Sequence, residues 1–249
     1  MLQKVKFTVF LSLLISLSCN AQDISGIAIS DSYESVKNAV EKLVKFDATL
    51  KLVDKNKNET GFIALQEVQK PEYTKADQFT VFKAQNGDVW FFQRKQTFAP
   101  EERMTVGVLE DALIEKYGSP SIKDEYRLIW FYDAKGALYA SKDNYDYGPC
   151  GSIIDHAVVQ TFTLSQKPRL YARVDGIPSL FSENCGKAVI VNYGKDLKNE
   201  NIVTYLIVTL VNADVMYKQV EDAEKEEERL EKEKRDFENA QGEKNKPKL

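Results

Sequence analysis

The dipeptide Asn86-Gly87 constrains the fold more than any other feature, because it separates two long segments of aromatic and β-branched residues. Asn-Gly favours the two-residue type I′ turn, whose twist matches that of antiparallel strands. The sequence therefore predicts a hairpin with strands at residues 78–85 and 88–96. A two-residue loop fixes the register, which places Ala84 opposite Val89, Lys83 opposite Trp90, Phe82 opposite Phe91 and Val81 opposite Phe92.

Both faces of this hairpin carry aromatic side chains, so at least one face is expected to pack against helices. If the other face is open, it forms an apolar surface for a partner, made of Phe79, Val81, Trp90 and Phe92. Monomeric proteins rarely expose such patches, so burial of both faces is the favoured alternative.

Two amphipathic helices are expected beside the hairpin. Ser32 is a suitable N-cap for the first, and the second is expected to begin with Pro100 at its first position. Gly118 suits the C-terminal cap of the second helix. The apolar positions recur at helical spacing and comprise Val36, Ala39, Val40, Leu43 and Val44 in the first helix and Val106, Leu109, Ala112, Leu113 and Tyr117 in the second.

Further strands are expected on both sides of these helices. Residues 50–53 and 61–68 read as strands, and residues 127–133 and 137–141 read as a hairpin that turns at Asp133 to Gly136. After a polar loop at 143–151, four more segments have strand composition, at residues 157–164, 169–174, 187–193 and 202–211.

The last 37 residues have a different composition, with twelve acidic and nine basic side chains. A helix is expected from Ala213 to Ala240, supported by pairs of opposite charge at i and i+4, namely Glu221–Lys225, Glu228–Lys232 and Glu231–Arg235. Met216, Val220, Ala223, Leu230 and Phe237 form an apolar seam that Glu227 and Lys234 interrupt. A solvated single helix is the favoured interpretation, and a weak coiled coil with a partner is the alternative.

These features predict an α+β fold: an antiparallel sheet with helices packed on one face, plus a protruding charged C-terminal helix. The chain divides into a signal peptide at 1–21, a helix-on-sheet unit at 22–141, a β-rich unit at 142–212 that continues or packs on the first, and a charged helical tail at 213–249.

Residues 1–21 have the pattern of an export signal. Lys4 and Lys6 give a charged start, and residues 7–17 form an apolar run too short to span a bilayer of about 30 Å as a helix. Small residues before Gln22 favour cleavage after Ala21. We therefore expect a secreted or periplasmic protein.

The alternative is that Cys19 is lipidated and anchors the protein to the envelope, although Ser16 occupies the position where such signals usually carry Leu. In either case Cys150 and Cys185 remain as a pair in an oxidising compartment, which predicts a disulfide. A catalytic pair of Cys150 with His156 is the weaker interpretation.

Removal of the signal takes away Lys4 and Lys6 and shifts the formal net charge from −4 to −6. This balance disfavours nucleic acid as a partner. We expect no cofactor and no metal site: His156 is the single histidine, and Asp143, Asp146 and Asp155 lack the spacing of an EF-hand.

A family resemblance rests on two segments. Residues 25–27 followed by 32–36, and residues 116–120 followed by 130–136, resemble the helix-to-hairpin order of small secreted α+β modules such as the β-lactamase inhibitor protein and the small outer-membrane-assembly lipoproteins. The resemblance covers about residues 24–141 and implies a noncatalytic binding module without identifying a ligand.

The leading functional hypothesis is therefore an exported noncatalytic module that acts through a protein or envelope component. A second hypothesis is a hydrolase-like enzyme with carboxylates assembled from distant strands, such as Glu67, Asp88, Asp133 or Asp155. A third is a structural spacer in which the tail helix sets a distance.

Overall fold

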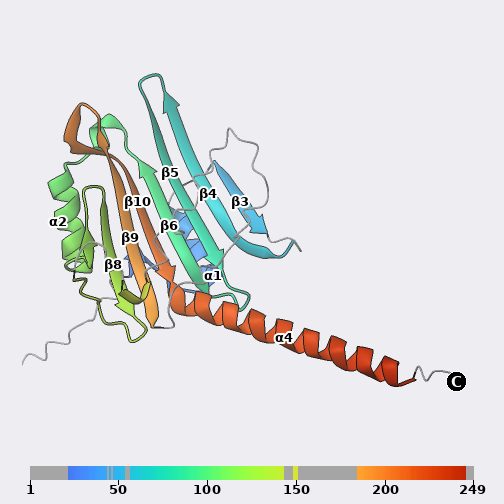
Figure 1. Ribbon diagram of the computed structural model, residues 1–249. Helices are drawn as coiled ribbons and strands as arrows, with labels where there is room; N and C mark the ends of the chain where they lie inside the picture. The colour runs from blue at the N-terminus through green and yellow to red at the C-terminus, as the bar shows by residue number, and fades with distance from the viewer. Residues whose placement is uncertain are drawn as a thin grey trace, which may run out of the picture.

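The computed structural model describes residues 22–43, 45, 47–53, 57–142, 148–150 and 184–244. An eight-stranded antiparallel sheet dominates it (Figure 1) and confirms the expected α+β class. The strand order is β3 (Ala48–Val53), β4 (Glu59–Lys70), β5 (Tyr73–Lys83), β6 (Val89–Thr97), β10 (Asn199–Asn212), β9 (Cys185–Asp196), β8 (Arg127–Asp133) and β7 (Ile122–Lys123). The strands expected at 157–164 and 169–174 lie outside the described residues.

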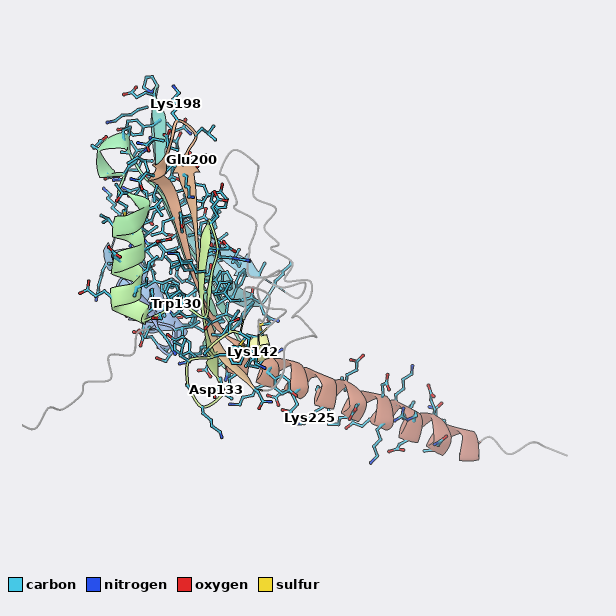
Figure 2. The ribbon with its side chains drawn as sticks, turned by 60° about the vertical axis from the view of Figure 1, so that its left-hand side comes forward. Trp130, Asp133, Lys142, Lys198, Glu200 and Lys225 are labelled. Atoms are coloured by element: carbon cyan, nitrogen blue, oxygen red, sulfur yellow. A yellow bond between two sulfur atoms is a disulfide. The ribbon has the colours of Figure 1, made fainter. Side chains whose placement is uncertain are left out.

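Two helices, α1 (Tyr33–Leu43) and α2 (Val106–Tyr117), pack on what we call the first face of the sheet (Figures 1 and 2). A two-stranded ribbon of β1 (Asp23–Ile24) and β2 (Ile27–Ala28) joins the same core. Alternate residues along each strand face these helices, as the period of two requires. The core on this face includes Phe62, Phe79, Val81, Phe92, Leu128, Trp130, Val191 and Leu210.

The α1 helix begins as the sequence predicts, with the Ser32 hydroxyl accepting a hydrogen bond from the Ser35 amide. Val36 and Val40 are fully buried against the sheet, whereas Leu43 is 43% exposed, because the last turn extends beyond the core. The predicted apolar stripe is therefore correct in its centre and wrong at Leu43.

The start of α2 differs from the prediction. Pro100 begins a separate 3-10 turn, η1 (Pro100–Glu102), and the α-helix starts at Val106. Thr105 is its N-cap, with its hydroxyl accepting from the amide of Val108. Gly118 ends the helix at a φ of 81°, as expected for a glycine cap.

The Asn86-Gly87 hairpin forms with a different turn. The Gly87 amide donates to the carbonyl of Ala84, and Gly87 has a φ of 90°, but Asn86 does not have the positive φ that a type I′ turn requires. The loop is therefore three residues long, with a type I turn followed by a left-handed glycine. This shifts the pairing, so that Lys83 lies opposite Val89.

A β-bulge at Trp90 then restores the predicted register. Beyond it, Phe82 pairs with Phe91 and Val81 pairs with Phe92, as expected. Since one extra residue reverses the alternation of side chains, Trp90 lies on the second face, where its ring stacks on Phe82 at a centroid distance of 5.5 Å.

The hairpin expected after α2 forms only in part. Asp133 and Gly136 close the predicted turn, with the Gly136 amide donating to the Asp133 carbonyl. Residues 137–141 do not form a regular strand, because beyond one isolated bridge between Tyr132 and Leu138 the chain leaves the sheet.

The strands β9 and β10 belong to the same sheet as the strands that precede them, and they lie between β6 and β8. The described strands of the β-rich segment after residue 142 thus continue the first sheet. A disulfide between Cys150, in η2 (Gly148–Cys150), and Cys185, at the start of β9, joins a core on the second face.

The last element, α4 (Ala213–Lys244), follows β10 without a loop and projects away from the sheet (Figure 1). Ala213 and Met216, in its first turn, are buried in the core of the second face. At about 1.5 Å per residue, its 32 residues extend for about 48 Å.

Candidate functional site

The apolar surface predicted on the Asn86-Gly87 hairpin is not a surface. Phe79, Val81 and Phe92 are fully buried beneath the helices of the first face. Trp90 does not accompany them, because the bulge turns it to the opposite face, where it is half-buried. The prediction that these four side chains form a partner surface is therefore wrong.

The carboxylates of the hydrolase hypothesis do not come together. Glu67 and Asp133 are five strand spacings apart, which is about 24 Å. Asp88 lies at the same end of the sheet as Asp133 but three spacings away, or about 14 Å. Both separations exceed the 5–10 Å range of paired glycosidase carboxylates. Asp155 lies outside the described residues.

The cysteine prediction is confirmed, since Cys150 and Cys185 form a disulfide with their Cα atoms 5.0 Å apart. Cys19 and His156 lie outside the described residues. Within the part that the structure describes, no helix is long and apolar enough to cross a membrane, and no cluster of three metal-binding side chains occurs.

A half-buried ion pair ties the β1–β2 ribbon to the sheet. The Arg94 guanidinium donates to both carboxylate oxygens of Asp77 and to the hydroxyl of Ser25, and it lies over the ring of Phe79. Every polar group of this cluster is satisfied by its neighbours, so its role is structural.

A second polar contact anchors α1 to β4. The Tyr33 hydroxyl donates to Glu59 at 2.7 Å, and Lys51 pairs with the same carboxylate at 3.1 Å. Burial and this hydrogen bond raise the pKa of Tyr33. Burial also acts to raise the pKa of Glu59, but the contacts from Tyr33 and Lys51 outweigh it and lower that pKa below its ordinary value.

Tyr193 makes a similar contact on the first face. Its hydroxyl donates to Glu110 on α2 at 3.1 Å. Burial, assisted by the charge of Glu110, raises the pKa of Tyr193 to about 12. A phenol with such a pKa remains protonated at neutral pH, so this contact fastens α2 to β9 and supplies no general base.

The second face carries a row of buried polar side chains across its three central strands. Thr80 on β5, Gln93 on β6 and Thr209 on β10 are directly opposite one another. The Gln93 amide donates to the Thr209 hydroxyl at 2.9 Å, although the two residues are 116 positions apart in the chain.

Lys95 lies one step along β6 from this row, opposite Gln78 and Ile207. Its ammonium forms no hydrogen bond or ion pair with the described residues, and burial lowers the pKa of Lys95. Sequence reasoning missed this group, because nothing in the local pattern at residues 93–97 shows which strands flank it. The row offers one cation and neutral hydrogen-bonding groups, but no pair of a nucleophile and a base.

The α4 helix is the most exposed element of the molecule. Every described side chain from Lys218 to Gly242 is exposed, including Leu230 at 51% and Phe237 at 63%. Figure 2 shows the helix extending away from the sheet, with Lys225 on its projecting part. Ion pairs along the helix support it without help from the sheet: Lys218–Asp214, Lys225–Glu221, Arg229–Glu226, Arg229–Glu233 and Arg235–Glu231.

Two of the three charge pairs predicted in this helix therefore form. Lys225 is 2.6 Å from Glu221, and Arg235 is 3.6 Å from Glu231, but no contact joins Lys232 to Glu228 among the described residues. Of the members of the predicted apolar seam whose side chains the structure describes, Met216 is buried and Leu230 and Phe237 are exposed.

Comparison of the chain with protein-family models, with curated proteins and with solved structures finds no match.

Proposed function

We propose that this protein is an exported, noncatalytic binding module that acts through a protein partner, and that α4 makes the contact. The observation that carries the proposal is the projection of α4: a helix about 48 Å long is anchored by its first turn and leaves two large apolar side chains in solvent. Export follows from the signal pattern of residues 1–21, and the resemblance to secreted inhibitor and assembly modules supports a role without catalysis.

The arrangement of the described carboxylates favours binding over hydrolysis as the function. Asp133 is about 14 Å or more from the other described carboxylates of the hydrolase hypothesis. Leu230 and Phe237 lie seven residues apart on the same side of the projecting helix and are more than half exposed, so a partner can contact both of them together.

A spacer is the second candidate, because the ion pairs along α4 stiffen the helix and give it a defined length. The two candidates differ in what they require of α4. A binding helix needs the side chains of Leu230 and Phe237, whereas a spacer needs only the length of the helix.

The test is affinity capture of envelope proteins from the producing cell, using the chain from Gln22 onward as bait. We expect one specific protein to be retained. Loss of that protein with Leu230→Ser/Phe237→Ser supports binding through α4. A spacer would tolerate this double substitution but not deletion of residues 221–249. If the full chain retains nothing beyond the background of an unrelated exported bait, the proposed function is wrong.

A further inference from the structure

The face of α4 that carries Leu230 also carries Phe237, because seven residues correspond to nearly two helical turns. We call the half of the helix centred on Leu230 the Leu230 face. Both side chains lie beyond the part of α4 that contacts the sheet, and Phe237 is about 30 Å along the helix from the buried Met216. A partner can therefore reach the Leu230 face without displacing any part of the folded sheet.

Charges are distributed unequally around the helix. Successive residues are separated by 100°, so positions within 90° of Leu230 can be read from the sequence. Among described side chains from Lys218 to Gly242, the Leu230 face holds five acids and one base, which are Asp222, Glu226, Glu227, Glu233, Glu238 and Lys234. The opposite half holds four acids and five bases, with Lys225, Lys232 and Arg235 among the bases.

Only part of the acidic charge is neutralised within the helix. Arg229, at the edge of the Leu230 face, pairs with both Glu226 and Glu233. Glu227 and Glu238 form no ion pair with the described residues. The apolar side chains are thus flanked by carboxylates that remain free for a partner.

A second copy of this chain is a poor occupant of the Leu230 face. In a parallel pair, Glu227 would face its own copy and Lys234 would face its own copy, so both contacts would join like charges. In an antiparallel pair, Lys234 could meet Glu227 of the other copy, but the remaining acids of the Leu230 face would find no further base on the opposing face. The net charge of −6 expected for the mature chain adds a general repulsion between copies.

We propose that the occupant is a basic amphipathic helix of a partner protein. Its apolar residues would cover Leu230 and Phe237, and Lys or Arg residues beside them would face Glu227 and Glu238. This inference rests on the proposed function and deepens it, because it gives the chemistry of the partner.

The test uses two synthetic helices as probes with the chain from Gln22 onward. Both are three-heptad amphipathic peptides with Leu at the core positions; one carries Lys at the flanking positions and the other carries Glu. In fluorescence anisotropy we expect the lysine peptide to bind at least about 30-fold more tightly than the glutamate peptide. Raising the salt from about 0.05 M to 0.5 M should weaken the lysine peptide by about tenfold.

Variants of α4 locate the binding site. Leu230→Ser/Phe237→Ser should raise the Kd of the lysine peptide by at least about tenfold, whereas Leu197→Ser should leave it within about twofold. Leu197 is the matched apolar control, since it is fully exposed in the turn between β9 and β10. Lys198, in the same turn, and Glu200, at the start of β10, mark the end of the sheet remote from α4 (Figure 2).

A second pair of variants tests the charge. Glu227→Lys/Glu238→Lys should weaken the lysine peptide by about tenfold, while Glu228→Lys/Asp236→Lys, the same change on the opposite half of α4, should have an effect of about twofold or less. Equal losses in the two variants would show that net charge alone attracts the peptide and would overturn the inference.

Other results also overturn it. Equal binding of the two peptides, or no binding of either, rules out a basic partner. A dimer in sedimentation at micromolar concentration that Leu230→Ser/Phe237→Ser abolishes would assign the face to a second copy. If envelope capture succeeds while the lysine peptide fails, the proposed function stands and this inference does not. If the peptide binds as expected and capture fails, the inference about chemistry stands without the proposed function.

Discussion

The helices α2 and α4 differ in what keeps them helical. In α2, three of twelve residues are buried against the sheet, and both ends are capped, by Thr105 and by Gly118. In α4, which is 32 residues long, the described side chains that are buried lie in the first turn, and ion pairs between neighbouring turns support the described remainder. A short helix of the first kind depends on tertiary packing, whereas a long charged helix can persist by itself.

The difference has a practical consequence for experiments. Substitutions on the sheet side of α2 affect the whole fold, and substitutions on the projecting part of α4 should affect only what binds there. Five predictions test this separation, beginning with the largest expected effect.

Trp130→Ala should break the docking of α2. The Trp130 side chain is fully buried on the α2 side of the sheet (Figure 2); its indole donates to the Gly118 carbonyl at 2.8 Å and its ring packs on Tyr117. We expect a loss of about 3–5 kcal/mol in the free energy of unfolding, measured by urea denaturation. Leu197→Ala, at a fully exposed site, is the control. Equal stability of the two variants would show that α2 does not depend on this contact.

Reduction of the disulfide should destabilise the sheet and leave α4 helical. Cys150 and Cys185 are 35 residues apart, and opening a loop of that size costs about 4 kcal/mol in the chain-entropy account. The measurement is denaturation with and without reductant, followed by Trp fluorescence for the sheet and by far-ultraviolet circular dichroism for the helices. A midpoint that does not move on reduction would mean that the bridge adds no stability.

Met216→Ala tests the larger of the two described side chains that are buried in the first turn of α4. Met216 is 3% exposed in the core of the second face, so its truncation should cost about 2 kcal/mol. The projecting part of α4 lies beyond the sheet. We therefore expect the far-ultraviolet circular dichroism signal of the helices, measured at low denaturant concentration, to be nearly unchanged. A large loss of helicity would show that the anchor also supports the projecting part.

Tyr33→Phe should cost about 1 kcal/mol at pH 7, because it removes the hydrogen bond to Glu59. The pKa of Glu59 is lower in the folded protein, so its stabilising contribution is present above the pKa of the unfolded chain and is lost as pH falls through the folded pKa. The difference in the free energy of unfolding between wild type and variant should therefore become smaller below about pH 4.5. A gap that stays constant from pH 7 to pH 3 would contradict this linkage.

Leu230→Ser/Phe237→Ser should have the smallest effect on folding. Both side chains are more than half exposed, so the free energy of unfolding should change by less than about 0.5 kcal/mol. Equilibrium denaturation checks this directly. A larger loss would mean that the Leu230 face contacts the body of the protein, and binding defects of the double variant would then need reinterpretation.

The sequence predicts those parts of the fold that short-range chemistry controls. The Ser32 cap, the Gly118 cap and the pairing of Val81 with Phe92 are all confirmed. Asn86-Gly87 specifies a hairpin, but a type I turn with a left-handed glycine competes with type I′ for the same dipeptide. The bulge that follows moves Trp90 to the other face, which a simple alternation of residues does not reveal.

The pairing of strands that are far apart in the chain could not be predicted from the sequence. The pairing of β6 with β10 joins residues more than 100 positions apart, and it creates the contact of Gln93 with Thr209 and places Ile207 opposite Lys95. For the candidate site the position of α4 in the chain was predictable from its charge pattern. The sequence did not predict which apolar residues of α4 are buried, because Met216 and Leu230 belong to the same seam and only contact with the sheet distinguishes them.

Because no loop separates β10 from α4, the distance of the Leu230 face from the sheet and the direction in which it points are fixed together. Asn212 is the last residue of a central strand and Ala213 the first of the helix, so the strand sets the axis of the helix. Each residue added before Leu230 would advance the Leu230 face by about 1.5 Å and turn it through about 100°. The Leu230 face therefore points in a defined direction around the helix axis. Insertion of one or two residues would turn this face away from its partner, and insertion of seven would nearly restore its direction about 10 Å farther out.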